Sequence, residues 1–303
     1  MEKIYLIFDY FKEAFHMNKD NKKIYGPQIA LIILKTLTVI VCGLIIYSYI
    51  GSDKFMDYDA SKWFFFVITS LLWLGLLLLG LGIISLIVES GLYNMYKKCV
   101  INNELAPGDF KEGVKKYFFK FLLGDILVAV AWIVICIPYL IVGVITLTIG
   151  LAVIPLIANI FLTMWKVSIV MKDNDVITAF KDSFSFAKRN FLALTVLQLI
   201  HWAFVKGATT SGGFNSYYSF TNPSSPANSV PGKYSSFNGP SMEDVVKVAK
   251  IICAILIPVI SIATFVASII TMIFEVFFSL VIFIAYIKKF ESENTLEVTP
   301  DVV

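Results

Sequence analysis

Long runs without a charged side chain dominate this sequence and limit the folds open to it. The clearest run, residues 63–88, contains no charge and begins with the aromatic cluster Trp63, Phe64, Phe65 and Phe66. As a helix, about 20 apolar residues cross a hydrocarbon layer about 30 Å thick, and aromatic side chains are enriched at its interfaces. Several such runs predict an all-α, polytopic transmembrane helical bundle.

About six spans are expected within a single integral membrane domain of residues 1–303. Residues 126–165 carry no charge, and 40 positions are too many for one crossing, so this run is divided at the glycines and threonines near its middle. The last run could form one kinked helix or two tight crossings, and Pro258 is its only helix breaker. The expected spans are about 28–50, 63–89, 119–144, 149–171, 191–207 and 248–287.

Composition argues against two broad classes of protein. Hydrophobic residues make up 58% of the chain and charged residues only 16%, against about 25% charged residues in soluble domains. Lysine supplies 24 of the 25 basic residues and Arg189 the other, whereas recognition of bases and phosphates generally favours arginine. We therefore expect neither a water-soluble fold nor nucleic-acid binding.

The distribution of basic residues predicts the orientation, because Lys and Arg accumulate in the cytoplasmic loops. With six spans and the N-terminus inside, 17 basic residues lie inside and six outside, with Lys35 and Lys166 within spans. A seventh span would move Lys288 and Lys289 outside. Both termini are expected in the cytoplasm, with the protein in the plasma membrane of a bacterium.

The long loop of about residues 207–243 is expected on the outer side. Its composition changes abruptly to Ser, Gly, Asn, Pro and Tyr, and four prolines argue against a long regular helix. The loop is either a solvated connector or a segment that recognises a ligand with its six aromatic side chains.

Three charged stretches before the first, third and fifth spans carry apolar residues at helical spacing. Such amphipathic helices lie in the membrane interface, and all three are expected at the cytoplasmic face. The stretches share similar text, FKEAF at 11–15, FKEGV at 110–114, and VITAF at 176–180 followed by Lys181. The similarity indicates either three repeats or a pattern common to helices rich in Phe and Lys.

Anionic lipid is the expected partner of these basic stretches, because each lysine near an anionic surface contributes about 1 kcal/mol of attraction. Stretches 109–120 and 175–190 are predicted to lie parallel to the membrane with their cationic faces toward the headgroups. The predicted headgroup contacts are Lys111, Lys115, Lys116, Lys181, Lys188 and Arg189.

Ionisable side chains inside spans are costly and often mark relays or pathways. Asp125 lies near the start of its span, where it can anchor the helix through water or Lys120, or take part in transport. Glu275 is deeper in an uncharged stretch and is the stronger candidate for a role inside the bundle, unless the span ends near it. His201 is expected near the outer interface, and Lys166 is expected to extend toward headgroups without a chemical role.

Motifs of catalysis and metal binding are missing from the sequence. It contains no His-Glu-x-x-His, Gly-x-Ser-x-Gly, Walker or dinucleotide-binding pattern. The four cysteines are scattered singly and suit neither a disulfide framework nor a zinc site. No enzymatic activity, cofactor or metal is expected.

Residues 158–196 contain an apolar helix, a short acidic turn, and then Ala-Phe-Lys-x-Ser with Lys-x-Asn-Phe entering the next span. This segment resembles bacterial membrane families that include the membrane domain attached to some glycerophosphoryl diester phosphodiesterases. The resemblance implies a six-span fold and a bacterial membrane location. In those families the phosphodiesterase chemistry belongs to a separate soluble barrel domain, so the resemblance implies no catalytic residue here.

Two functional classes follow from these observations. The basic stretches favour an auxiliary or scaffolding protein in membrane or envelope homeostasis. Asp125, Glu275 and the possible repeats suit a small-solute or lipid transporter, or a transporter subunit. A transporter is expected to have a polar cavity that reaches Glu275, and a scaffold a filled interior. The sequence identifies no membrane-protein partner.

Overall fold

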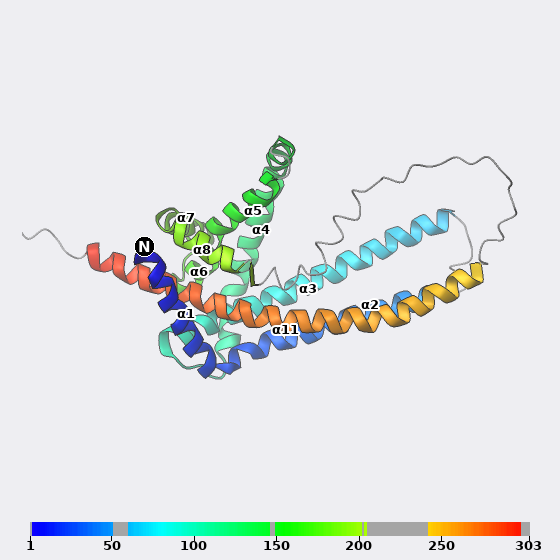
Figure 1. Ribbon diagram of the computed structural model, residues 1–303, viewed down its shortest axis with the longest axis horizontal. Coiled ribbons are helices and arrows are strands. Elements are labelled where there is room, and N and C mark those ends of the chain that lie inside the picture. Colours follow the sequence, from blue (N-terminus) through cyan, green and yellow to red (C-terminus); the bar gives the residue numbers. More distant parts are fainter. Residues whose placement is uncertain (1, 51–59, 146–148, 202, 205–241, 298–303) are drawn as a thin grey trace, which may run out of the picture. The chain divides into compact units, whose positions relative to one another are not determined.

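The structure is a computed structural model that describes residues 2–50, 60–145, 149–201, 203–204 and 242–297 (Figure 1). Helices account for nearly all of these residues, and none of them lies in a strand. The predicted all-α class is confirmed. The predicted outer loop lies almost entirely outside the described residues.

Four helices of the described chain are long and apolar enough to cross a membrane. The four candidate spans are 26–45 residues long, which exceeds the length that a bilayer requires. The chain is therefore a multi-pass membrane protein. The four helices are α2 (Tyr25–Ile50), α3 (Ala60–Asn102), α4 (Asp109–Ile145) and α11 (Met242–Glu297).

The fourth and fifth expected spans are shorter than predicted. The expected span 149–171 is divided into α5 (Ile149–Leu162) and α6 (Trp165–Lys172). At the break, Ser183 Oγ accepts a hydrogen bond from Met164 N and donates one to the Phe161 carbonyl, so a side chain replaces regular helical bonding. The fifth expected span contains α8 (Phe191–His201), an apolar helix of 11 residues.

The last apolar region lies within a single helix. Helix α11 continues through Pro258, so the alternative of two tight crossings is wrong. No turn interrupts the apolar residues on either side of this proline, and the helix tolerates the loss of one backbone donor.

The expected separate interfacial helix at 109–120 is also wrong, because this stretch is the first part of α4. The sequence between it and the predicted span contains no helix breaker. Buried positions follow one another at helical spacing across the predicted boundary, and they keep the same face of α4 against its neighbours. These positions are Gly113, Tyr117, Phe121 and Gly124.

The other two amphipathic stretches form separate helices, α1 (Glu2–Asp20) and α7 (Val176–Arg189). A 3-10 turn, η1 (Lys22–Ile24), connects α1 to α2. The apolar stripe of α7 packs on protein: Phe180 stacks on Trp165 and Phe184 on Phe161, each pair with ring centres 4.9 Å apart. Helices α5 and α6 thus cover the stripe that the sequence assigned to the membrane interface.

The three similar stretches occupy matched environments. When FKDSF at 180–184 is aligned with FKEAF and FKEGV, the small fourth residue of each is buried (Ala14, Gly113 and Ser183). The acidic third residue of each pairs with a lysine near the C-terminal end of another helix. These ion pairs are Glu13–Lys288, Glu112–Lys98 at 3.7 Å and Asp182–Lys172 at 2.9 Å. The matched contacts favour the repeat interpretation.

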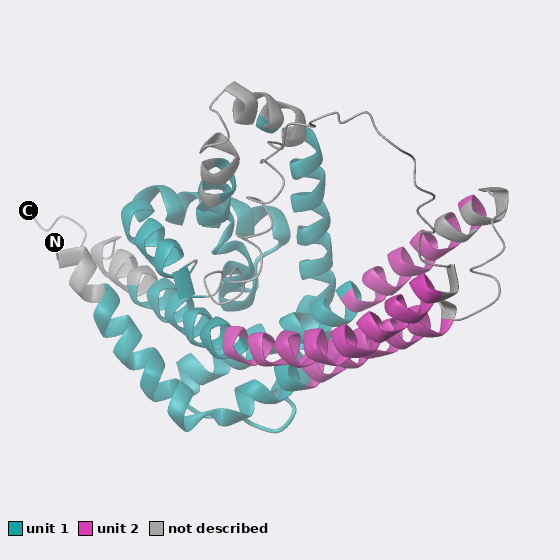
Figure 2. Cartoon of the chain, turned by 45° about the vertical axis from the view of Figure 1, so that its right-hand side comes forward, with its two compact units in different colours: residues 1–29, 82–206, 272–303 teal, residues 30–81, 207–271 magenta. Residues whose placement is uncertain are grey.

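The chain divides into two compact units (Figure 2). Unit 1 comprises residues 1–29, 82–206 and 272–303, and unit 2 comprises residues 30–81 and 207–271. In unit 2, four consecutive residues of α3, from Leu71 to Leu74, are all exposed. Apolar side chains therefore surround this part of the helix, as they do in helices that lie in lipid.

Aromatic side chains link the helices of unit 1. Tyr93 of α3 contacts Phe283 of α11 and Phe121 of α4, with ring centres 5.6 and 5.3 Å apart. Phe121 in turn contacts Trp165 of α6 at 5.9 Å, and Trp165 stacks on Phe180 of α7. Such edge-on and stacked contacts stabilise the packing of five helices beyond the burial of apolar area.

Candidate functional site

Three ionisable side chains from three helices meet in unit 1. Lys166 Nζ of α6 lies 2.8 Å from both carboxylate oxygens of Glu89 of α3 and 3.2 Å from the nearer oxygen of Asp125 of α4. The lysine side chain is only 15% exposed, whereas Glu89 is 35% and Asp125 42% exposed. We call these three residues the Lys166 cluster.

Aromatic rings form one wall of the Lys166 cluster. Lys166 Nζ lies 5.2 Å from the ring centre of Trp165 and 5.4 Å from that of Phe121, within the range of cation–π attraction. A Cβ atom at Gly124 would lie 2.2 Å from the Trp165 ring. Glycine at this position therefore allows α6 to approach α4 closely enough for Lys166 to reach Asp125.

A second cluster has the opposite balance of charge. Asp173 pairs with Lys116 at 3.0 Å and with Lys120 at 2.9 Å, and we call these three residues the Asp173 cluster. The hydrogen bond from Lys120, aided by Lys116, holds the pKa of the Asp173 carboxyl below its usual value. Together with Asp125–Lys166, the pair Lys120–Asp173 fixes α4 antiparallel to α6.

Lysines also cap the C-terminal end of α6. Asp173 has a left-handed conformation (φ 58°) and ends the helix. Lys97 Nζ donates to the Val170 carbonyl at 2.7 Å, and Lys120 Nζ donates to the carbonyls of Asp173 and Asn174 at 3.1 and 3.2 Å. Cations at this end complement the partial negative charge of the exposed carbonyls.

The turn between α6 and α7 is held by side-chain hydrogen bonds. Asp182 Oδ2 accepts bonds from Ser168, Lys172 and Asn174 at 2.9–3.1 Å. Asp175 caps the N-terminus of α7 by accepting a bond from the Thr178 amide, and hydrogen bonds from the side chain and the amide of Thr178 lower the pKa of its carboxyl. The acidic turn noted in the sequence therefore has a structural role in unit 1.

The Lys166 cluster differs from the prediction in its partners. Asp125 was expected to reach water or Lys120, but Lys120 bonds to Asp173 and Asp125 pairs with Lys166. Lys166 was expected to extend toward headgroups and is instead half-enclosed by two carboxylates. Sequence reasoning missed Glu89, although its position as the first charge after a long apolar run could have marked it.

Glu275 and His201 lie on other elements of unit 1. Glu275 is exposed on α11, and its charge acts on Tyr93, which also lies near Glu89 and Asp125. The His201 ring packs edge-on against Phe278, with ring centres 5.1 Å apart, at the end of α8. Glu275 thus acts on Tyr93 from α11, and His201 is a packing residue.

The predicted headgroup lysines fall into two groups. Lys116 belongs to the Asp173 cluster and is already paired. Among the residues that the structure describes, no carboxylate pairs with the exposed side chains of Lys111, Lys115, Lys181 or Lys188. Arg189 is exposed and donates to Ser185 Oγ at 2.8 Å.

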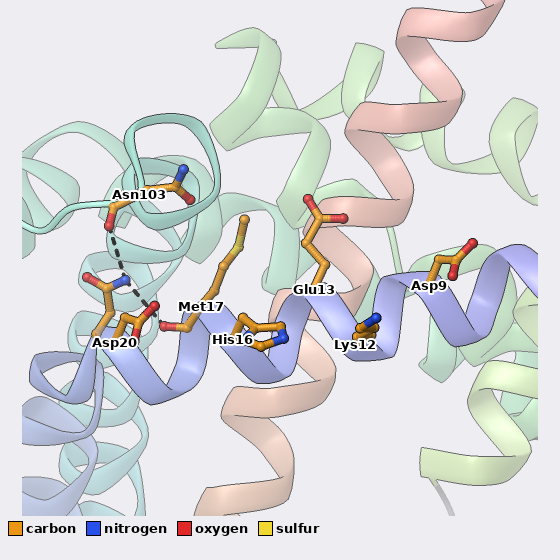
Figure 3. A pocket seen from close by; sticks show the side chains of 8 residues that line it. Asp9, Lys12, Glu13, His16, Met17, Asp20 and Asn103 are labelled. Atoms are coloured by element: carbon orange, nitrogen blue, oxygen red, sulfur yellow. Dashed lines mark hydrogen bonds between the residues drawn. The ribbon is translucent and has the colours of Figure 1, made fainter.

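A groove of about 560 Å³ runs along α1 (Figure 3). Asp9, Glu13, His16 and Asp20 face it at helical spacing, and Asn21 Nδ2 closes one end by donating to the Asn103 carbonyl at 3.3 Å. Lys288 already pairs with Glu13. Across the described ranges, no three His, Cys, Asp or Glu side chains are arranged to hold a metal ion.

Comparison of the chain with family models, with curated proteins and with solved structures gave no match. The resemblance of residues 158–196 to bacterial membrane families therefore stays a prediction from the sequence.

Proposed function

We propose that this protein is an auxiliary or scaffolding protein of the bacterial plasma membrane that associates with anionic lipid at the cytoplasmic face. The observation that carries the proposal is the division of its lysines. Lys116, Lys120, Lys166 and Lys172 are paired with carboxylates, whereas Lys111, Lys115, Lys181 and Lys188 point outward without an ion pair to any described residue.

The outward face of α4 supports this proposal. It carries Lys111 and Lys115 in its first turns and then Phe119, Ile126 and Val130, which are all at least half exposed. At a rise of about 1.5 Å per residue, Lys115 lies about 6 Å along the axis from Phe119. When the exposed apolar residues lie in hydrocarbon, these lysines are at the depth of the headgroups.

The outward face of α7 has a similar character. Ile177, Lys181 and Lys188 follow one another at spacings of four and seven residues, and all are exposed. Helical residues at these spacings share one side, so an apolar side chain and two cations lie along it. Such a face suits the boundary between headgroups and acyl chains.

Lipid that co-purifies with matched variants tests the proposal. Lys111→Gln with Lys115→Gln should lower the ratio of anionic to zwitterionic lipid measured by native mass spectrometry. Each lysine contributes about 1 kcal/mol near an anionic surface, so the loss should be several-fold and smaller at high salt. Lys116→Gln with Lys120→Gln removes the same charge from the same helix and should leave this ratio unchanged, because both lysines are engaged by Asp173. An equal effect of the two pairs would contradict the proposal.

A small-solute or lipid transporter, or a transporter subunit, is the second candidate. The Lys166 cluster supports it, since ionisable groups within apolar spans often belong to relays. The α1 groove does not include Glu275 or any residue of this cluster. Proton-dependent flux in vesicles that is lost in Asp125→Asn would favour this second function over the first.

A further inference from the structure

The Lys166 cluster contains more negative than positive charge. One ammonium group serves two carboxylates, so the three side chains carry a net charge of −1 when all are ionised. Glu89 and Asp125 lie within apolar stretches long enough to cross a membrane. An uncompensated charge in such a position is costly and calls for a further positive charge.

The surrounding elements supply no second cation from the described residues. Helix α3 contributes the Tyr93 phenol next to Glu89, and α4 and α6 contribute the rings of Phe121 and Trp165. Helix α11 contributes Glu275, whose charge acts on Tyr93. Lys166 is the one cation in the described chain within ion-pair distance of Glu89 or Asp125.

The Asp173 cluster provides a comparison within the same pair of helices. There, one carboxylate has two lysines: Asp173 lies in the turn after α6, and all three side chains are 32–48% exposed. Water and salt can screen the excess charge at that position. Lys166, at 15% exposure, is less accessible to such screening.

We propose that Glu89 and Asp125 hold one exchangeable proton between them, which makes the Lys166 cluster a proton-binding site within the membrane-spanning part of unit 1. With the proton bound to a carboxylate oxygen the cluster is neutral; when the proton passes to water, the cluster carries one negative charge. Two carboxylates that share a site commonly ionise in separate steps for this reason.

Lys166 contacts the two carboxyls at different distances. Lys166 binds both oxygens of Glu89 at 2.8 Å, whereas the oxygens of Asp125 lie at 3.2 and 3.4 Å. The shorter, bidentate contact makes Glu89 the closer ion-pair partner of Lys166. The proton is therefore assigned to the pair of carboxyls that Lys166 bridges, and not to one of them.

Difference infrared spectroscopy during a pH titration in lipid nanodiscs tests this site. The parent protein should carry Glu275→Gln, so that Glu275 contributes no signal. We expect one protonated-carboxyl band at neutral pH that disappears at alkaline pH. Asp125→Asn or Glu89→Gln alone should each abolish the band, because the remaining carboxylate then pairs one-to-one with Lys166. Lys166→Gln should increase the band about two-fold, since both carboxyls lose their cation.

Asp173→Asn is the matched control and should leave the band unchanged, because its carboxylate is served by two lysines. Absence of the band from the Glu275→Gln parent at neutral pH would overturn the proposal, and this measurement does not depend on the folding of any further variant. Persistence of the band in the double variant that carries both Glu89→Gln and Asp125→Asn would also overturn the proposal. Lipid association of the lysines on α4 and α7 is not required for any of these outcomes.

Discussion

Single residues determine how closely α4 and α6 pack. Gly124 is buried against Trp165, and any side chain at this position meets the indole ring. The sequence alone marked Asp125 as a charge near the start of a span, but it could not identify Lys166 and Glu89 as partners. Those residues are 41 and 36 positions away along the chain, and only the packing of three helices brings them together.

Gly124→Ala should therefore destabilise unit 1. The added methyl group would displace the Trp165 ring, and overpacking of this kind costs about 1–3 kcal/mol. The measurement is the unfolding midpoint of the purified protein in detergent. Gly82→Ala in α3 is the matched control, because nothing lies within 4 Å of its added Cβ and alanine is the better helix former. Equal midpoints for the two variants would refute the role of this close approach.

At the scale of elements, hydropathy predicts the long helices well and their ends poorly. Helices α2, α3 and α11 contain the first, second and last expected spans, because long apolar runs without breakers have few alternatives. The break before α6 depends on Ser183, which is distant in sequence from Met164 and gives no local signal. The amphipathic pattern correctly predicts that α7 is a helix. The pattern does not show whether lipid or other helices cover its apolar stripe, which packs on α5 and α6.

The contact between α4 and the end of α6 should weaken in acid. The pKa of Asp173 is lowered in the folded protein, so its contribution to stability is present above the usual carboxyl pKa of about 4 and is lost as pH falls through the lower folded value. Because this side chain is 48% exposed, the contribution is below about 1 kcal/mol.

The free energy of unfolding of the wild type and of Asp173→Asn, measured from neutral pH down to a pH below about 4, checks this dependence. The difference in stability between the two proteins should shrink as the pH falls. A difference that stays constant over this range would show that ionised Asp173 does not stabilise the turn.

For the whole molecule, the sequence was sufficient to predict an all-α membrane protein, and the structure adds a division of charge that the sequence does not contain. Inward lysines meet carboxylates in the Lys166 and Asp173 clusters, and outward lysines on α4 and α7 lie beside exposed apolar residues. The proposed scaffold requires these outward lysines to face the cytoplasm, where the surface of the inner leaflet is anionic.

Accessibility of introduced cysteines in intact cells tests this requirement most directly. With Cys42, Cys99, Cys136 and Cys253 replaced, a cysteine at Ser225 should react with a membrane-impermeant thiol reagent. Cysteines at Lys188 in α7 and at Asn294 in α11 should react only after the cells are permeabilised. Labelling at Lys188 in intact cells would place the cationic face of α7 outside and contradict the proposed association with the cytoplasmic leaflet.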